Sequence, residues 1–239
     1  MKKMLTIIYA YYDNPMMFVV QQKEWAKYPD AIREQIEFIV VDDCSPRWPC
    51  WRDLKLDVDI KIFRMLEDIP WNMDACRNLA VSKSDTNWIF ISDMDHLLPI
   101  QTIKEIFHHM GRLNIEKFYT FERVNAPDLT SYKPHPNTYL LTRGLYDKVG
   151  GYDETFAGHY GTDGHFRRAL LHHSKGQVML NIPIVRYPRE VISDASTTTL
   201  DRKKGRSQEL GKKYRELSAQ NLQEGIKPKT LSFPWEQLC

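Results

Sequence analysis

Cysteine is scarce in this 239-residue sequence. The four cysteines are Cys44, Cys50, Cys76 and Cys239, and their spacing matches no zinc-binding or redox motif. The sequence therefore gives no reason to expect a structural zinc ion or a disulfide framework. Free thiols are typical of a reducing compartment, so we expect a cytoplasmic protein.

Long hydrophobic runs and a large excess of one charge are also missing. Apolar segments such as residues 38–41 are far shorter than the roughly 20 residues that a membrane-spanning helix needs. The basic start at residues 1–4 precedes a brief apolar stretch without a small-residue cleavage site, which indicates a buried first strand rather than a signal peptide. The net charge of +2 does not by itself indicate nucleic-acid binding.

What the sequence does contain is an alternation of short apolar runs with helical segments, which predicts an α/β fold. Strands are expected at residues 5–9, 37–41, 59–64, 88–92, 117–124, 137–142, 178–180 and 184–187. Helices are expected at residues 15–28, 74–82, 100–113, 162–173 and 201–223. Because no repeat or low-complexity linker interrupts this order, we expect a single domain.

Acidic residues follow three of the expected strands. Asp13 follows the first, Asp42 and Asp43 the second, and Asp93 and Asp95 the fully apolar strand at 88–92. Ligands of open α/β sheets bind beyond the carboxyl ends of the strands. A single aspartate there is often only a turn former, but close carboxylates repel one another and favour a divalent cation, Mg²⁺ or Mn²⁺. Such a cation can stabilise a diphosphate leaving group.

Five segments resemble known glycosyltransferases. Residues 89–99, I-F-I-S-D-M-D-H-L-L-P, resemble the D-x-D segment of GT-A glycosyltransferases and are similar to the F-S-D-V-D-L-I-P of the β-1,4-galactosyltransferase type. Residues 40–45, V-V-D-D-C-S, and 75–80, A-C-R-N-L-A, resemble V-V-D-D-G-S and A-R-N segments of family-2 glycosyltransferases. The remaining similarities are G-G-Y-D-E at 150–154 with G-T-D-G-H-F at 161–166, and V-I-S-D-A-S at 191–196.

The resemblance implies a GT-A, Rossmann-like fold: a mixed, mostly parallel sheet flanked by helices. It implies inverting, metal-dependent transfer of a sugar from a UDP-sugar to an acceptor hydroxyl, with Asp163 as the general base. The residues that it places against the nucleotide-sugar are Tyr11, Asp13, Asp42, Asp43, Arg77, Asn78 and Asp93. The residues that it places around Mn²⁺ or Mg²⁺ are Asp93, Asp95, Asp194, which stands where the family has a histidine, and His96 as an alternative ligand.

The resemblance also divides the chain. Residues 1–98 are expected to bind the nucleotide-sugar, residues 99–200 the acceptor, and residues 201–239 form a basic C-terminal helix and tail. The loop at 127–136 and His159 are expected on the acceptor side. The acceptor is expected to be a saccharide or a hydroxymethylated base in DNA, and the sequence indicates no oligomeric state.

The basic stretch late in the chain has three interpretations. It fits a solvated helix face, a lid over the diphosphate, or a track for an anionic acceptor. The residues concerned are Arg202, Lys203, Lys204, Arg206, Lys212, Lys213 and Arg215.

Three other functions share features of this sequence with glycosyl transfer. A haloacid-dehalogenase-like phosphotransferase also places D-x-D after an apolar strand, but it needs Thr or Val where Leu97 stands. A sugar nucleotidyltransferase needs a glycine-rich loop after the first strand, and residues 10–14 contain no glycine. A non-catalytic nucleotide-sugar-binding module remains open because fold does not impose function. The presence of both Asp95 and Asp163 favours an enzyme.

Overall fold

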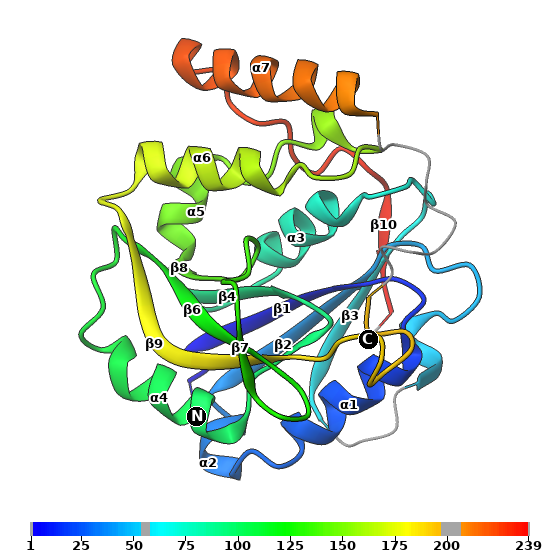
Figure 1. The fold of residues 1–239 in the computed structure, drawn as a ribbon, viewed down its shortest axis with the longest axis vertical. Coiled ribbons are helices and arrows are strands. Elements are labelled where there is room, and N and C mark those ends of the chain that lie inside the picture. Colours follow the sequence, from blue (N-terminus) through cyan, green and yellow to red (C-terminus); the bar gives the residue numbers. More distant parts are fainter. Residues whose placement is uncertain (1, 54–57, 197–206, 239) are drawn as a thin grey trace.

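The computed structural model describes residues 2–53, 58–196 and 207–238. A ten-stranded sheet lies between two layers of helices (Figure 1). The strands are β1 (Leu5–Tyr11), β2 (Ile36–Asp42), β3 (Ile60–Met65), β4 (Trp88–Asp93), β5 (His96–Leu97), β6 (Phe118–Asn125), β7 (Thr130–Tyr132), β8 (Tyr139–Thr142), β9 (Gln177–Arg186) and β10 (Trp235–Gln237).

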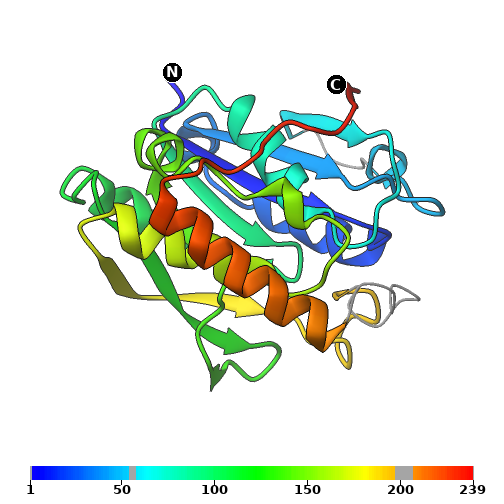
Figure 2. The ribbon, with the colours of Figure 1, turned by 90° about the horizontal axis from the view of Figure 1, so that it is seen from above.

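The helices cover both faces of the sheet, and within the described residues none has the length and apolar character to cross a membrane. They are α1 (Pro15–Trp25), α2 (Asp30–Arg33), α3 (Met73–Ser82), α4 (Ile100–Met110), α5 (Arg143–Val149), α6 (Asp163–His173) and α7 (Gln208–Glu224), with short 3₁₀ turns at η1 (Cys50–Asp53) and η2 (Glu154–Phe156). Helices α1, α2 and α4 lie on one side of the sheet, and α3, α5 and α6 on the other, with α7 outermost against α6 (Figures 1 and 2).

Strand order determines which chain segments meet at the functional edge. The order is β10-β3-β2-β1-β4-β8-β6-β9-β5, with β7 paired to β6. Strands β1 to β4 are parallel neighbours, β8 is antiparallel to β4, β6 is antiparallel to β8, and β9 is parallel to β6. The carboxyl ends of β1, β4, β6 and β9 therefore meet at one edge of the sheet.

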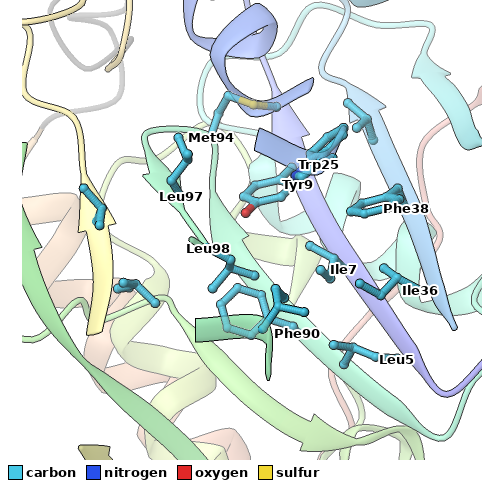
Figure 3. Packing of buried hydrophobic residues seen from close by; sticks show 14 of the residues in the cluster. Leu5, Ile7, Tyr9, Trp25, Ile36, Phe38, Phe90, Met94, Leu97 and Leu98 are labelled. Atoms are coloured by element: carbon cyan, nitrogen blue, oxygen red, sulfur yellow. The ribbon is translucent and has the colours of Figure 1, made fainter. Parts of the chain in front are cut away.

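Two hydrophobic cores explain why the central strands are apolar on both faces. Successive side chains of a strand point to opposite faces, and in β1 Ile7 and Tyr9 belong to one core while Ile8 belongs to the other. In the first core, Trp25 of α1 stacks on Phe38 at 4.6 Å between ring centroids and lies near Tyr9 (Figure 3). Burial on both faces removes the alternation of apolar and polar residues that a one-sided sheet shows.

The C-terminal segment returns to the first half of the sheet. Glu154 is buried and accepts hydrogen bonds from the backbone amides of Leu231 at 2.8 Å and Ser232 at 2.7 Å. Strand β10 then pairs with the outer edge of β3. One sheet thus connects the beginning, the middle and the end of the described chain.

The predicted α/β class is confirmed, whereas several predicted boundaries are wrong. The two short strands expected at 178–180 and 184–187 are one strand, β9, because a shift in register at its partner Phe121/Glu122 accommodates Pro183 within the pairing. Helix α1 ends at Trp25 instead of residue 28. Helix α5 and strands β7 and β10 were not predicted, since segments this short carry little periodicity. Helix α7 begins at Gln208, and residues 201–206 of the expected helix lie outside the described residues.

Candidate active site

A cavity of about 340 Å³ opens at the edge where the carboxyl ends of β1, β4, β6 and β9 meet. Five of the predicted site residues line it: Arg77, Asp93, Asp95, His96 and Asp163. Its lining also includes Tyr12, Asn14, Trp71, Asp74, Arg123, Tyr132, Lys133, His135, His159, Tyr160, Thr162 and Arg186.

Arg77 links the carboxylates of the cavity wall. Its guanidinium is buried on α3, with Nη2 at 2.7 Å from Oδ1 of Asp93 and Nη1 at 3.0 Å from Oδ1 of Asp74. The same Nη1 lies 3.6 Å from Oδ1 of Asp163, the first residue of α6. The guanidinium also lies over the ring of Tyr152 at 5.1 Å. One buried cation thus brings the D-x-D segment of β4 and the predicted base of α6 to the same wall.

The pKa values of two carboxylate partners of Arg77, Asp93 on β4 and Asp74 on α3, shift in opposite directions. Burial acts to raise the pKa of Asp93, but Arg77 and His135 outweigh burial and hold that pKa well below its usual range. Burial raises the pKa of Asp74 to about 6 although Arg77 opposes the shift, and Asp74 accepts a hydrogen bond from Oγ1 of Thr162 at 2.6 Å. Asp93 is therefore ionised at neutral pH, as a cation ligand must be.

Each aspartate of the D-x-D segment is paired with an imidazole. Nε2 of His135 lies 3.3 Å from Oδ2 of Asp93, and Nδ1 of His96 lies 2.8 Å from Oδ1 of Asp95. The two imidazole rings lie against one another with their centroids 4.0 Å apart. Burial lowers the pKa of His96, so its ring is neutral at pH 7. His135 comes from the loop at 127–136 that the sequence assigned to the acceptor side.

The arrangement fits a cation that is held partly by its substrate. Within the described ranges, no group of three or more His, Cys, Asp or Glu residues is close enough to hold a metal ion by itself. Mg²⁺ is usually bound by one or two carboxylates while phosphate and water oxygens complete its octahedron. Asp93 and Asp95, both lining the cavity, supply two such carboxylates. The donor set therefore fits Mg²⁺ or Mn²⁺ arriving with a diphosphate.

Asp194, the third predicted metal ligand, contacts a helix instead. Its two carboxylate oxygens accept hydrogen bonds from the backbone amides of Met16 at 2.7 Å and Met17 at 3.0 Å, in the first turn of α1. A carboxylate is favourable at this position because it satisfies amides that have no partner within the helix and lies at the positive end of the helix dipole. Metal binding by Asp194 stays a prediction.

We expect Asp194→Ala to lower the free energy of unfolding by about 1 kcal/mol, the usual cost of removing a helix cap. Urea denaturation of the variant and of Asp194→Asn measures this, since asparagine keeps one acceptor oxygen and should retain most of the stability. If the carboxylate only caps α1, the affinity for Mn²⁺ in the presence of UDP should change little. A tenfold or larger loss of Mn²⁺ affinity in both variants would instead identify Asp194 as a ligand.

Four predicted nucleotide-binding residues shape the loop at residues 44–50. Asp42 accepts hydrogen bonds from the amides of Ser45 and Cys50, and Asp13 accepts one from the amide of Trp48 at 2.8 Å. The Tyr11 hydroxyl donates to the carbonyl of Trp48, and Asp43 is fully buried. These four residues, Tyr11, Asp13, Asp42 and Asp43, lie outside the lining of the cavity. Their contact with a nucleotide stays a prediction.

Asn78 is likewise outside the cavity lining. Its amide donates to Glu154 at 2.7 Å and to the carbonyl of Tyr152 at 2.8 Å, and its oxygen accepts from the amide of Tyr152 at 2.9 Å. Gly151 is required here because it has φ +81° and a Cβ would lie 2.7 Å from Oδ1 of Asn78. The A-R-N segment thus anchors the turn at 150–154, and nucleotide binding by Asn78 stays a prediction.

Several cavity residues were not predicted from the sequence. Arg123 lies near the carboxyl end of β6, Arg186 ends β9, and Tyr132 lies in the β6–β7 hairpin. Nothing local marks these side chains, since their position depends on the order of strands in the sheet. Trp71 and Tyr160 also meet at the cavity, with ring centroids 4.7 Å apart.

Comparison with known proteins gives structural matches only. No protein-family model and no curated protein matches the sequence. Residues 1–349 of TarS from S. aureus, in complex with UDP-GlcNAc, match with a TM-score of 0.64 at 14% identity, over 83% of this chain and 62% of that one. The mannosyltransferase PcManGT from Pyrobaculum calidifontis, in complex with GDP-Man and Mn²⁺, matches with a TM-score of 0.59 at 14% identity, over 78% and 57%.

The comparison confirms the predicted GT-A architecture. The present chain spans less than two thirds of the length of either match. At 14% identity the matches establish the fold, and the similarity to the β-1,4-galactosyltransferase type stays a prediction.

Proposed function

We propose that this chain is a glycosyltransferase that moves a sugar from a UDP-sugar to an acceptor hydroxyl with the help of Mn²⁺ or Mg²⁺. The observation that carries the proposal is the convergence of Asp93, Asp95 and Asp163 on one cavity, where Arg77 joins Asp93 to Asp163. The cavity lies at the edge where ligands of open α/β sheets bind. Two proteins with this fold, one bound to UDP-GlcNAc and one to GDP-Man and Mn²⁺, support the choice of donor.

In this proposal each carboxylate has a separate task. Asp93 and Asp95 would hold the divalent cation, which when bound would supply charge stabilisation to the departing diphosphate. Asp163 accepts the proton of the acceptor hydroxyl while that oxygen attacks the anomeric carbon. Arg77 keeps the D-x-D segment and Asp163 at a common wall. A single displacement with one base inverts the anomeric configuration, and no covalent sugar–enzyme intermediate forms.

The two sides of the cavity suit a division between donor and acceptor. Residues 1–98 contribute Tyr12 and Asn14 beyond β1 and the D-x-D segment beyond β4. Residues 99–200 contribute the hairpin of β6 and β7, His159 and the start of α6. We assign the first side to the UDP-sugar and the second to the acceptor, a saccharide or a hydroxymethylated base in DNA. Residues 201–239 complete the chain with α7 and β10.

Only part of the late basic stretch lies within the described residues. Lys212, Lys213 and Arg215 lie exposed on α7. The other four basic residues of this stretch, Arg202, Lys203, Lys204 and Arg206, lie outside the described residues. A role of the stretch in holding an anionic acceptor stays a prediction.

Release of UDP from UDP-sugars tests the proposed function. We expect slow hydrolysis with Mn²⁺, because water can replace the acceptor, and loss of that hydrolysis in excess EDTA. A panel of UDP-sugars with UDP release as readout measures it, and a subsequent acceptor screen includes hydroxymethylated DNA. Full activity in EDTA would contradict the metal requirement.

The same assay separates the alternatives. A non-catalytic module would bind UDP and Mn²⁺ without releasing UDP from any UDP-sugar. A haloacid-dehalogenase-like enzyme would release inorganic phosphate from a phosphomonoester such as p-nitrophenyl phosphate. Either result would overturn the proposed glycosyl transfer.

A further inference from the structure

Two arginines lie together at the end of the cavity farthest along the sheet from β1. Arg123 is the sixth residue of β6, and Arg186 is the last residue of the neighbouring strand β9. Their guanidinium carbons lie over the ring of Tyr132, at 4.6 Å and 5.1 Å from its centroid. All three side chains line the cavity, as does the exposed Lys133. The cavity therefore ends in three cationic side chains on an aromatic support.

The positive charge of this cluster is poorly balanced by the protein. Arg123 is 5% exposed, donates from Nε to the carbonyl of Lys133 at 2.7 Å, and has Nη1 at 3.2 Å from Nε2 of His96. Among the described residues no carboxylate forms an ion pair with Arg123. Arg186 approaches a carboxylate only at 3.9 Å, from Nε to Oδ2 of Asp95.

A buried cation without a carboxylate partner is costly. By contrast, the guanidinium of Arg77, which lines the same cavity, lies close to three carboxylates. An anion entering between Arg123 and Arg186 would supply the missing charge, and planar guanidinium groups bind phosphate and carboxylate oxygens in pairs.

We propose that Arg123, Arg186 and Lys133 form an anion-binding subsite for a phosphate or carboxylate group of the acceptor. This inference rests on the proposed glycosyl transfer and specifies its acceptor as an anionic molecule. The subsite lies beyond the D-x-D segment from the β1 side, to which we assigned the UDP-sugar. An acceptor anchored here by its anionic group would present a neighbouring hydroxyl to the part of the cavity that Asp163 lines.

Methyl phosphate is the probe for this subsite, titrated by calorimetry into protein already saturated with UDP and Mg²⁺. We expect wild-type protein to bind it, and Arg123→Gln and Arg186→Gln each to raise its Kd by about tenfold to a hundredfold, the cost of a charge-assisted hydrogen bond. Methyl β-glucoside, which is uncharged, serves as the control ligand. Arg112→Gln, which removes an exposed arginine outside the cavity, serves as the matched control variant.

Arg186→Gln keeps the test decisive if the buried Arg123 variant is unstable, because Arg186 is only half-buried. The proposal is overturned if methyl phosphate does not bind, or if it binds both arginine variants as tightly as wild type. It is also overturned if methyl phosphate binds only in the absence of UDP, or if the arginine variants raise the Kd of UDP as much as that of methyl phosphate, since the arginines would then bind the donor diphosphate. Failure of the wild-type protein to bind UDP with Mg²⁺ would instead refute the proposed function.

Discussion

Asp163→Asn is expected to lower sugar transfer by about a hundredfold to ten-thousandfold, the usual effect of removing a positioned base. Asparagine has the shape of aspartate but cannot take up the proton of the attacking hydroxyl. The carboxylate is one third exposed and lies in the first turn of α6, where asparagine is also tolerated, so the fold should persist. The rate of transfer to an acceptor found in the screen, or of UDP release to water, measures the effect.

Three controls accompany this variant. The affinities for UDP and for Mn²⁺ should stay near those of the wild type, because Asp93 and Asp95 remain. Asp147→Asn, which changes an exposed aspartate of α5, should leave transfer unaffected. The anomeric configuration of the wild-type product should be inverted. Transfer by Asp163→Asn near the wild-type rate would remove Asp163 from the mechanism, and a retained configuration would contradict single displacement.

Asp95→Asn is expected to abolish the metal dependence of UDP binding and to lower turnover by at least about a hundredfold. A neutral amide holds Mn²⁺ or Mg²⁺ far less well than a carboxylate, and several kcal/mol of charge stabilisation on the leaving diphosphate are lost with the cation. The Kd of UDP is measured with Mn²⁺ and again in EDTA, and the ratio of the two values gives the metal-dependent part of UDP binding directly. In the variant the two values should be nearly equal.

The substitution also removes a charge that faces His96 and Arg186, at 2.8 Å and 3.9 Å. Urea denaturation therefore belongs with the binding measurement, so that loss of folding is not mistaken for loss of metal. Asp147→Asn again serves as the matched control. If the folded variant kept metal-dependent UDP binding, the cation site would have to lie elsewhere.

Much of the fold could be predicted from the sequence, because the patterns that indicate its longer strands and helices lie within short segments of the chain. The apolar run of β4 followed directly by Asp93 and Asp95 predicted both a buried strand and a site at its carboxyl end. The turn glycines at 150–151 and the acidic start of α6 were likewise visible in short segments. Short or interrupted elements such as α5, β7 and β9 were missed or misread, since a few residues of periodicity do not distinguish a strand from a loop.

The composition of the cavity wall could not be predicted in the same way. The sequence marked Asp194 as a metal ligand by its place in a motif, which stays a prediction, and only the structure shows that its carboxylate contacts the first turn of α1. It marked Arg77 for the nucleotide, which also stays a prediction, and only the structure shows that Arg77 is paired with Asp74, Asp93 and Asp163. Both side chains find partners that are remote in the chain, and a motif does not record such partners.

By itself the sequence determined the α/β class and the position of the D-x-D segment behind an apolar strand, because both depend on residues adjacent in the chain. Only the tertiary structure decided that Arg123 and Arg186 share Tyr132 and that one guanidinium joins Asp93 to Asp163. These contacts depend on β6 lying next to β9 and on the start of α6 lying close to α3, where Asp163 approaches Arg77 and Thr162 donates to Asp74. Strand order is set by the burial of both faces of the whole sheet, and no local pattern of residues contains it.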